Sequence, residues 1–106
     1  MNDRNRVRAL NDAFRQRLHG GRVVTTASLA DDPNLGTILN LVRNYSDFSE
    51  SNDPYGEHDF GDLVFEGEKI FWKIDYYDKS LTQGSLDPSD PRLTSRVLTI
   101  MRASEY

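Results

Sequence analysis

Residues 60–77 form two short apolar segments, 60–66 and 69–77, joined through Glu66-Gly67-Glu68. Segments of this length, joined by a short connection that contains glycine, are typical of an antiparallel β-hairpin. Side chains alternate between the two faces of a strand. One face of the second segment carries Ile70, Trp72, Ile74 and Tyr76, and the other carries Phe71, Lys73, Asp75 and Tyr77. We therefore predict a hairpin whose first face lies in the core.

Three helices and one further strand are predicted around this hairpin. The first helix covers residues 4–18, where Val7, Leu10, Phe14 and Leu18 recur at spacings of three and four. Its other sides carry Arg4, Arg8, Asn11 and Arg15, and Gly20-Gly21 ends it. Residues 22–27 are rich in β-branched side chains and predict a strand.

The two later helices are each predicted from an acidic residue that precedes proline. One follows Asp31-Asp32-Pro33 and runs to about residue 45; the other follows Ser89-Asp90-Pro91. The apolar face of the latter is formed by Leu93, Val97, Ile100 and Met101. A short strand is also predicted near residues 81–83. The fold class is therefore α+β: residues 1–106 form a single domain with a small, mostly antiparallel sheet of about three strands, covered by three helices.

The composition excludes several classes of protein. The chain has no cysteine, so it has neither disulfides nor thiolate metal ligands. Its longest apolar runs have two to three residues, and its start has no apolar stretch, so neither a membrane span nor a secretory signal is predicted. We expect a cytoplasmic protein that binds no cofactor.

The net charge of −4 hides an acidic block. Residues 46–90 carry −9, whereas residues 1–45 carry +3 and residues 91–106 carry +2. Nine of the eleven aromatic residues lie within residues 45–77, in the same part of the chain. An acidic block repels a phosphate backbone and attracts a basic partner. A solvated acidic face without a partner is the simpler alternative.

Residues 46–59 are the longest polar stretch and predict a loop. Aromatic and acidic side chains together are typical of a protein-binding surface, because tyrosine and tryptophan dominate binding hot spots. The predicted partner-binding residues are Asp47, Glu50, Asp53, Tyr55, Glu57, His58, Asp59, Asp75, Tyr77 and Asp78. The outward face of the hairpin, with Phe71 and Tyr77, would equally suit a homodimer.

His58 offers an alternative, a small enzyme or metal-binding protein. A catalytic site would use His58 with Glu57, Asp59 and Asp75, since a carboxylate beside a histidine orients its proton. No nucleophile motif or phosphate loop accompanies them. Glu57, His58 and Asp59 are adjacent, so in an extended chain they cannot all face one ion, and no metal site is predicted. The second histidine, His19, suits an interaction with the end of the first helix.

The arginines of the first helix do not predict direct nucleic-acid binding. They fall all round the helix instead of on one face, and the chain as a whole is acidic. We expect them to lie on a solvated helix.

Several motifs resemble one known family. They are NDPYGEHDFG at residues 52–61, FWKIDYYD at 71–78, LTIMRASEY at 98–106, RALNDAF at 8–14 and GGRVV at 20–24. They resemble the uncharacterised bacterial family catalogued as domain of unknown function 3768. The family has no established activity; its members occur mainly in alphaproteobacteria, often on plasmids and other mobile elements. The resemblance implies accessory work such as plasmid maintenance, anti-restriction or anti-CRISPR inhibition.

These observations together predict a small binding or inhibitor protein. Its acidic, aromatic surface would contact a basic protein of host defence or of a nucleic-acid-processing complex, by presenting carboxylates where phosphates would lie. An anti-CRISPR or anti-restriction protein is the most concrete form of this prediction.

Overall fold

A computed structural model describes residues 3–106 and confirms the hairpin. Strands β2 (Phe60–Phe65) and β3 (Glu68–Tyr77) pair in antiparallel fashion. Glu66 and Gly67 connect them with φ angles of 50° and 78°. Two successive positive φ angles are those of a type I′ turn, whose twist matches that of the flanking strands.

The prediction of a C-terminal helix after Pro91 is wrong, because residues 95–102 form strand β4 (Ser95–Arg102). β4 lies inside the sheet, antiparallel to β3 and parallel to β1 (Arg22–Thr25), in the order β1-β4-β3-β2. Arg96, Leu98 and Ile100 alternate along its buried face. Because β4 pairs with β3 along one edge and with β1 along the other, these residues adopt a strand with alternating burial instead of a helix. The predicted fold class is confirmed: the structure is α+β with a mostly antiparallel sheet, which has four strands within residues 3–106.

The short strand predicted near residues 81–83 is also absent from the described part of the chain. The segment after β3 forms only a single bridge, between Tyr77 and Gly84. Turns that follow it are stabilised by Asp78, whose carboxylate accepts hydrogen bonds from the Thr82 N–H and the Ser80 hydroxyl, both at 3.0 Å. Local side-chain bonds of this kind compete with strand pairing.

The first two predicted helices are present, and a short third one lies between them. Helix α1 (Asp3–Arg17) agrees with the prediction, and helix α3 (Leu35–Arg43) starts two residues beyond Pro33. The unpredicted helix α2 (Ala27–Ala30) follows β1, and a 3₁₀ turn, η1 (Ala103–Glu105), follows β4. Within residues 3–106 no helix is long and apolar enough to span a membrane.

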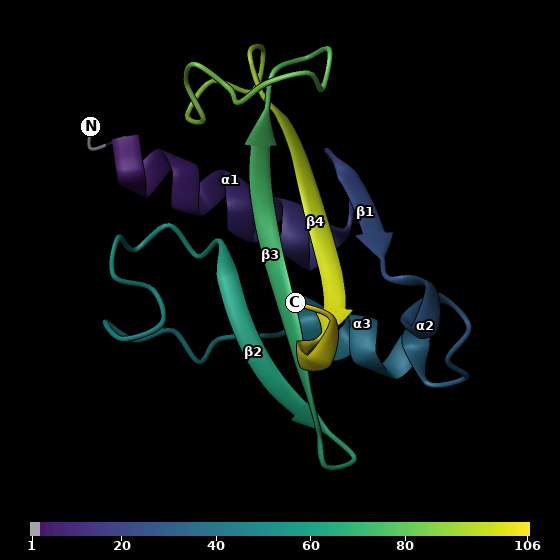
Figure 1. The fold of residues 1–106 in the computed structure, drawn as a ribbon. Coiled ribbons are helices and arrows are strands. Elements are labelled where there is room, and N and C mark those ends of the chain that lie inside the picture. Colours follow the sequence, from purple (N-terminus) through teal and green to yellow (C-terminus); the bar gives the residue numbers. More distant parts are fainter. Residues whose placement is uncertain (1–2) are drawn as a thin grey trace.

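The helices cover one face of the sheet, so the sheet has one buried and one open face (Figure 1). Trp72 lies at the centre of the buried face, opposite Ile100 of β4 and Gly61 of β2. Helices α1 and α3 pack against it through Phe14 and Val42. The predicted outward residues of β3 lie on the open face, where the C-terminal Tyr106 contacts Phe71.

Two polar residues of α1 are buried, contrary to the expectation of a solvated polar face. Asn11 is fully buried and Arg15 is 1% exposed. Arg15 donates from Nε to the Val42 carbonyl and from Nη2 to the Tyr45 carbonyl, both at 3.1 Å. A guanidinium can satisfy two carbonyls in a fixed geometry, so it joins α1 to the end of α3 and the start of the loop that follows.

Candidate functional site

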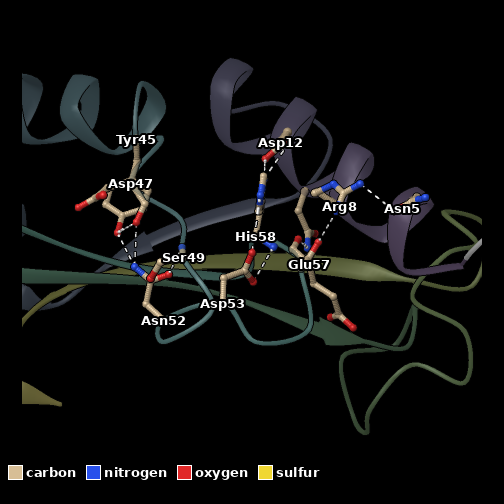
Figure 2. A network of polar contacts seen from close by, with 12 residues as sticks. Asn5, Arg8, Asp12, Tyr45, Asp47, Ser49, Asn52, Asp53, Glu57 and His58 are labelled. Carbon is tan, nitrogen blue, oxygen red and sulfur yellow. Dashed lines mark hydrogen bonds and ion pairs between the residues drawn. The ribbon is translucent and has the colours of Figure 1, made fainter.

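Residues 46–59 form a loop that α1 holds in place (Figure 2). Arg8 donates from Nη1 to the Gly56 carbonyl at 3.1 Å, and Asn11 donates from Nδ2 to the Glu57 carbonyl at 3.0 Å. The next residue of α1, Asp12, contacts the His58 ring. Three side chains from neighbouring turns of one helix therefore fix the second half of the loop.

His58 is the most constrained residue of this loop. Its Nδ1 lies 2.8 Å from Asp12 Oδ1, and its Nε2 lies 3.6 Å from Asp53 Oδ2. Its backbone N–H donates to Asp53 Oδ1 at 3.1 Å, and its ring stacks on Phe48 with centroids 3.7 Å apart. Its φ of 55° is uncommon for a residue other than glycine. Contacts on every side hold this backbone in a sparsely populated conformation.

The alternative catalytic set does not assemble around the ring. Of the described contacts of the His58 ring, none reaches Glu57, Asp59 or Asp75. Its carboxylate neighbours are Asp12 and Asp53 instead. A shallow cleft of about 240 Å³ adjoins the ring and is lined in part by Arg15 and Tyr45. Within residues 3–106 no group of three histidine or acidic side chains is placed to hold a metal ion.

Glu57 has a structural role beneath the loop. It accepts a hydrogen bond from the Tyr76 hydroxyl at 3.0 Å, and that hydroxyl accepts one from Asn11 Nδ2 at 2.8 Å. Burial raises the pKa of Tyr76 far above its usual range, so the hydroxyl stays protonated. Arg96 continues the chain of contacts by donating from Nε to Asn11 Oδ1 at 2.8 Å.

Asp59 lies where several carboxylates come close together. Burial raises its pKa, and the charges of Glu57, Asp53 and Asp75 raise it further. Asp75 itself pairs with Lys73 at 3.0 Å, and this hydrogen bond raises the pKa of Lys73. Four of the predicted acidic residues thus interact electrostatically: the charges of Asp53, Glu57 and Asp75 all raise the pKa of Asp59.

The remaining predicted residues are spread over three places: the exposed part of the loop, the open face of the sheet and the turn after β3. Asp47 and Glu50 are exposed in the first half of the loop, and Tyr55 is 65% exposed, with the guanidinium carbon of Arg4 5.3 Å from its ring centroid. Tyr77 is half-buried on the open face of the sheet. Asp78 lies beyond the end of β3, where a hydrogen bond from the Thr82 N–H lowers its pKa. Asp78 therefore belongs to the turn after β3.

Sequence reasoning missed the α1 side of this region. Asn11 and Asp12 both contact the loop, and Arg15 supports its start. A signal for Asn11 was present, because its distance of four residues from Val7 and three from Phe14 places it on the apolar face of the helix. Asp12 carried no such signal.

Comparison with known proteins gives one match. Residues 21–105 match the model of the family described as protein of unknown function (DUF3768). No curated protein and no solved structure matches the chain. The matched residues include the loop, β2, β3 and β4, and they start after α1. Because the match covers most of the chain, this protein belongs to the DUF3768 family.

Proposed function

We propose that this protein is a cytoplasmic binding protein that contacts a basic surface of a protein partner. The contact is made by what we term the acidic loop surface, formed by Asp47, Glu50, Tyr55, Glu57, Asp59 and Asp75. The observation that carries the proposal is geometric: contacts from α1 to Gly56, Glu57 and His58 hold this acidic loop in place. Burial raises the pKa of Asp59, and the charges of Glu57, Asp53 and Asp75 raise it further. Repulsion among these groups is relieved by an added positive charge.

A lysine or arginine from a partner would supply that charge. Carboxylates held close together repel one another in the free protein and so raise its free energy. A cation bound between them attracts each carboxylate and lowers the free energy of the complex. Such complementarity steers association and selects against acidic partners. Lys73 already pairs with Asp75, and the Tyr76 hydroxyl already donates to Glu57, so Asp59 is the carboxylate that would gain most.

The rigidity of the loop supports the same proposal. Long loops lose conformational entropy when they bind, and a loop that is already ordered loses less. Here Arg8, Asn11 and Asp12 hold residues 56–58 from below. Tyr55 stands beside them with most of its side chain exposed, as an aromatic anchor of the kind found in binding hot spots.

The most concrete form of the proposal is an inhibitor of a host defence complex, of the anti-restriction or anti-CRISPR type. Enzymes that handle DNA or RNA bind phosphates in grooves rich in lysine and arginine. Carboxylates spaced along a rigid loop can occupy such a groove in place of phosphates. The protein itself would bind the enzyme, not the nucleic acid.

A charge-reversal experiment tests the surface. The variant Asp47→Lys/Glu50→Lys changes two exposed side chains, and both described hydrogen bonds at Asp47 use its backbone carbonyl, so the loop should stay folded. The matched control Asp31→Lys/Glu66→Lys makes the same change of charge at two exposed residues outside the loop. The partner is captured with the wild-type protein and purified, and its affinity is then measured for each variant.

We expect the loop variant to bind about tenfold more weakly or worse, and the control to bind as the wild type does. In cells that carry a restriction or CRISPR system, the wild-type protein and the control should protect an incoming plasmid, whereas the loop variant should not. Equal losses in both variants would place the contact elsewhere. Full protection by the loop variant would do the same.

A further inference from the structure

A second, oppositely charged site lies at the other end of α1. A cavity of about 230 Å³ is bordered by the end of α1, the segment after β3 and the start of β4. Its lining includes four basic residues, Arg17, His19, Lys79 and Arg96, and no acidic residue. In a protein with a net charge of −4, such a wall is unexpected.

The turn after α1 brings these residues together. Leu18 and Gly20 have positive φ angles of 52° and 101°, which reverse the chain. Gly21 then passes so close to β4 that a Cβ atom would lie 2.6 Å from the Arg96 carbonyl oxygen and 2.8 Å from the Phe14 ring. Only glycine permits this approach. The end of α1 therefore rests directly on the strand that carries Arg96 (Figure 1).

Arg96 is a buried charge whose direct contacts are all uncharged. It is 4% exposed; Nε donates to Asn11 Oδ1, Nη2 donates to the Pro88 carbonyl, and the guanidinium lies 5.2 Å from the Tyr76 ring centroid. Within residues 3–106 no carboxylate forms an ion pair with it. Burial lowers the pKa of the guanidinium, which reports the cost of its desolvation.

Buried charges in proteins are ordinarily paired, because an unpaired one is costly. Nη1 of Arg96 has no hydrogen bond among the described residues, and this atom is accessible to solvent. Arg17 and Lys79 are exposed, and neither forms an ion pair within residues 3–106. Arg17, Lys79 and Arg96 thus line one cavity without a direct ion pair within residues 3–106, and the carboxylate that acts on Arg96, Glu57, does not line it.

We propose that this cavity binds a phosphate monoester group. Such a group carries about −1.5 to −2 charges at neutral pH, which suits several cations better than a single negative charge would. Nη1 of Arg96 is the guanidinium nitrogen left to donate to a phosphate oxygen, and Lys79 adds a mobile point charge. This site is separate from the acidic loop surface and does not depend on it.

The size and the remaining walls define the ligand further. Pockets that enclose drug-sized ligands measure roughly 300–1,000 Å³. A cavity of about 230 Å³ lies below this range, so it suits a phosphoryl group with a small part of the carbon skeleton attached to it. Leu10, Phe14 and Pro91 form an apolar wall beside the cations. The carbon skeleton of a phosphate ester would lie on this wall, and free inorganic phosphate would leave it uncovered.

Calorimetric titration of the full chain with inorganic phosphate and with adenosine monophosphate tests the proposal. Sodium acetate and sodium chloride at matched ionic strength serve as reference anions. The variant Arg17→Gln/Lys79→Gln removes two exposed cations of the cavity, and Arg43→Gln/Lys69→Gln removes two exposed cations elsewhere. Arg96→Gln is added as a buried variant, with its fold checked by circular dichroism.

We expect phosphate to bind the wild-type protein more tightly than either reference anion does, and the cavity variant to bind it about tenfold more weakly. The control should bind it as the wild type does. Tighter binding of the monophosphate than of inorganic phosphate would identify an ester that uses the apolar wall; equal binding would identify the phosphoryl group alone. Binding no stronger than that of acetate, or unchanged in the cavity variant, would overturn the proposal.

Discussion

Asp12 and His58, which are 46 positions apart in the sequence, meet with 2.8 Å between Oδ1 and Nδ1. The contact joins a helix to a loop that has no regular secondary structure of its own. On the other side of the ring, Phe48 stacks on His58 from within the same loop. The imidazole therefore connects α1 to the loop (Figure 2). Its removal should increase the mobility of residues 46–59.

Replacement of His58 by alanine should loosen residues 46–59. It removes the stack on Phe48 and one of the two partners of the Asp12 carboxylate, which still pairs with Arg15, so we expect a loss of about 1–3 kcal/mol in the free energy of unfolding. Amide hydrogen exchange should quicken in the loop more than in β3 or β4. The control His19→Ala changes an exposed side chain and should leave both measurements unaltered.

A glycine variant distinguishes the contribution of the His58 side chain to stability from that of its backbone conformation. His58→Gly loses the same contacts but has no penalty for the positive φ of 55°. We expect it to be about 1 kcal/mol more stable than His58→Ala. Equal stabilities of the two variants would show that the backbone at this position is not strained.

Gly61 is required by the close approach of β2 to the core. A Cβ atom there would overlap the Trp72 indole and would lie 2.7 Å from Cε1 of Tyr45. Gly61→Ala should therefore destabilise the protein by about 1–3 kcal/mol in urea unfolding. The control Gly36→Ala lies in α3 with open space around the new methyl group, and should stabilise the protein by about 0.5–1 kcal/mol. A tolerated alanine at Gly61 would contradict this account of the core.

Secondary structure was predicted correctly where the spacing of apolar residues fits only a helix or only a strand. The prediction failed where the spacing fits both. The hairpin was predicted correctly because alternation, the glycine turn and strand length all agreed. Residues 95–102 fit both patterns through different residues: Val97, Ile100 and Met101 recur at helical spacing, whereas Arg96, Leu98 and Ile100 alternate on the buried face of the strand. Pairing with β3 and β1 decides between them, and that pairing depends on chain segments at least 18 residues away. No local property of β4 contains this information.

The candidate site shows the same division. Composition and charge directed attention to residues 46–59, and the structure places Asp53, Glu57, Asp59 and Asp75 in one electrostatic environment. The partners supplied by α1 were not predicted, because Asp12 meets His58 only once the loop has folded back over the helix. Arg15 was assigned to solvent on its charge alone, although two main-chain carbonyls satisfy it in the interior.

Arg15 should be irreplaceable even by lysine. Two of its three bonded nitrogens donate to the carbonyls of Val42 and Tyr45, and the third donates to Asp12, a geometry that a single ammonium group cannot reproduce. Arg15→Lys and Arg15→Met should each lower the free energy of unfolding by about 1–3 kcal/mol for every buried carbonyl left unpaired. Arg17→Lys, an exposed change on the same helix, should have no effect. Denaturant unfolding measures all three, and a stable lysine variant would refute the role of the paired contacts.

The acidity of Asp59 predicts how stability depends on pH. Its pKa is raised on folding, so between the unfolded value, about 3.9, and the folded one the native state binds more protons than the unfolded state. Stability is therefore lost as the pH rises through this interval, and the full penalty is present at neutral pH. Asp59→Asn removes the penalty. We expect this variant to unfold at a higher temperature than the wild type at pH 7, with the difference vanishing below about pH 4.

Asp32 provides a control of opposite sign. Hydrogen bonds from the Asn34 N–H and from Arg102 lower its pKa, so its contribution to stability is present above the unfolded pKa and is lost as the pH falls through the folded one. Asp32→Asn should therefore destabilise the protein at pH 7 and have little effect in acid. Thermal unfolding of both variants across a pH series distinguishes the two cases. If Asp59→Asn destabilised the protein at neutral pH, Asp59 would be a stabilising carboxylate and the repulsion that underlies the acidic loop surface would be absent.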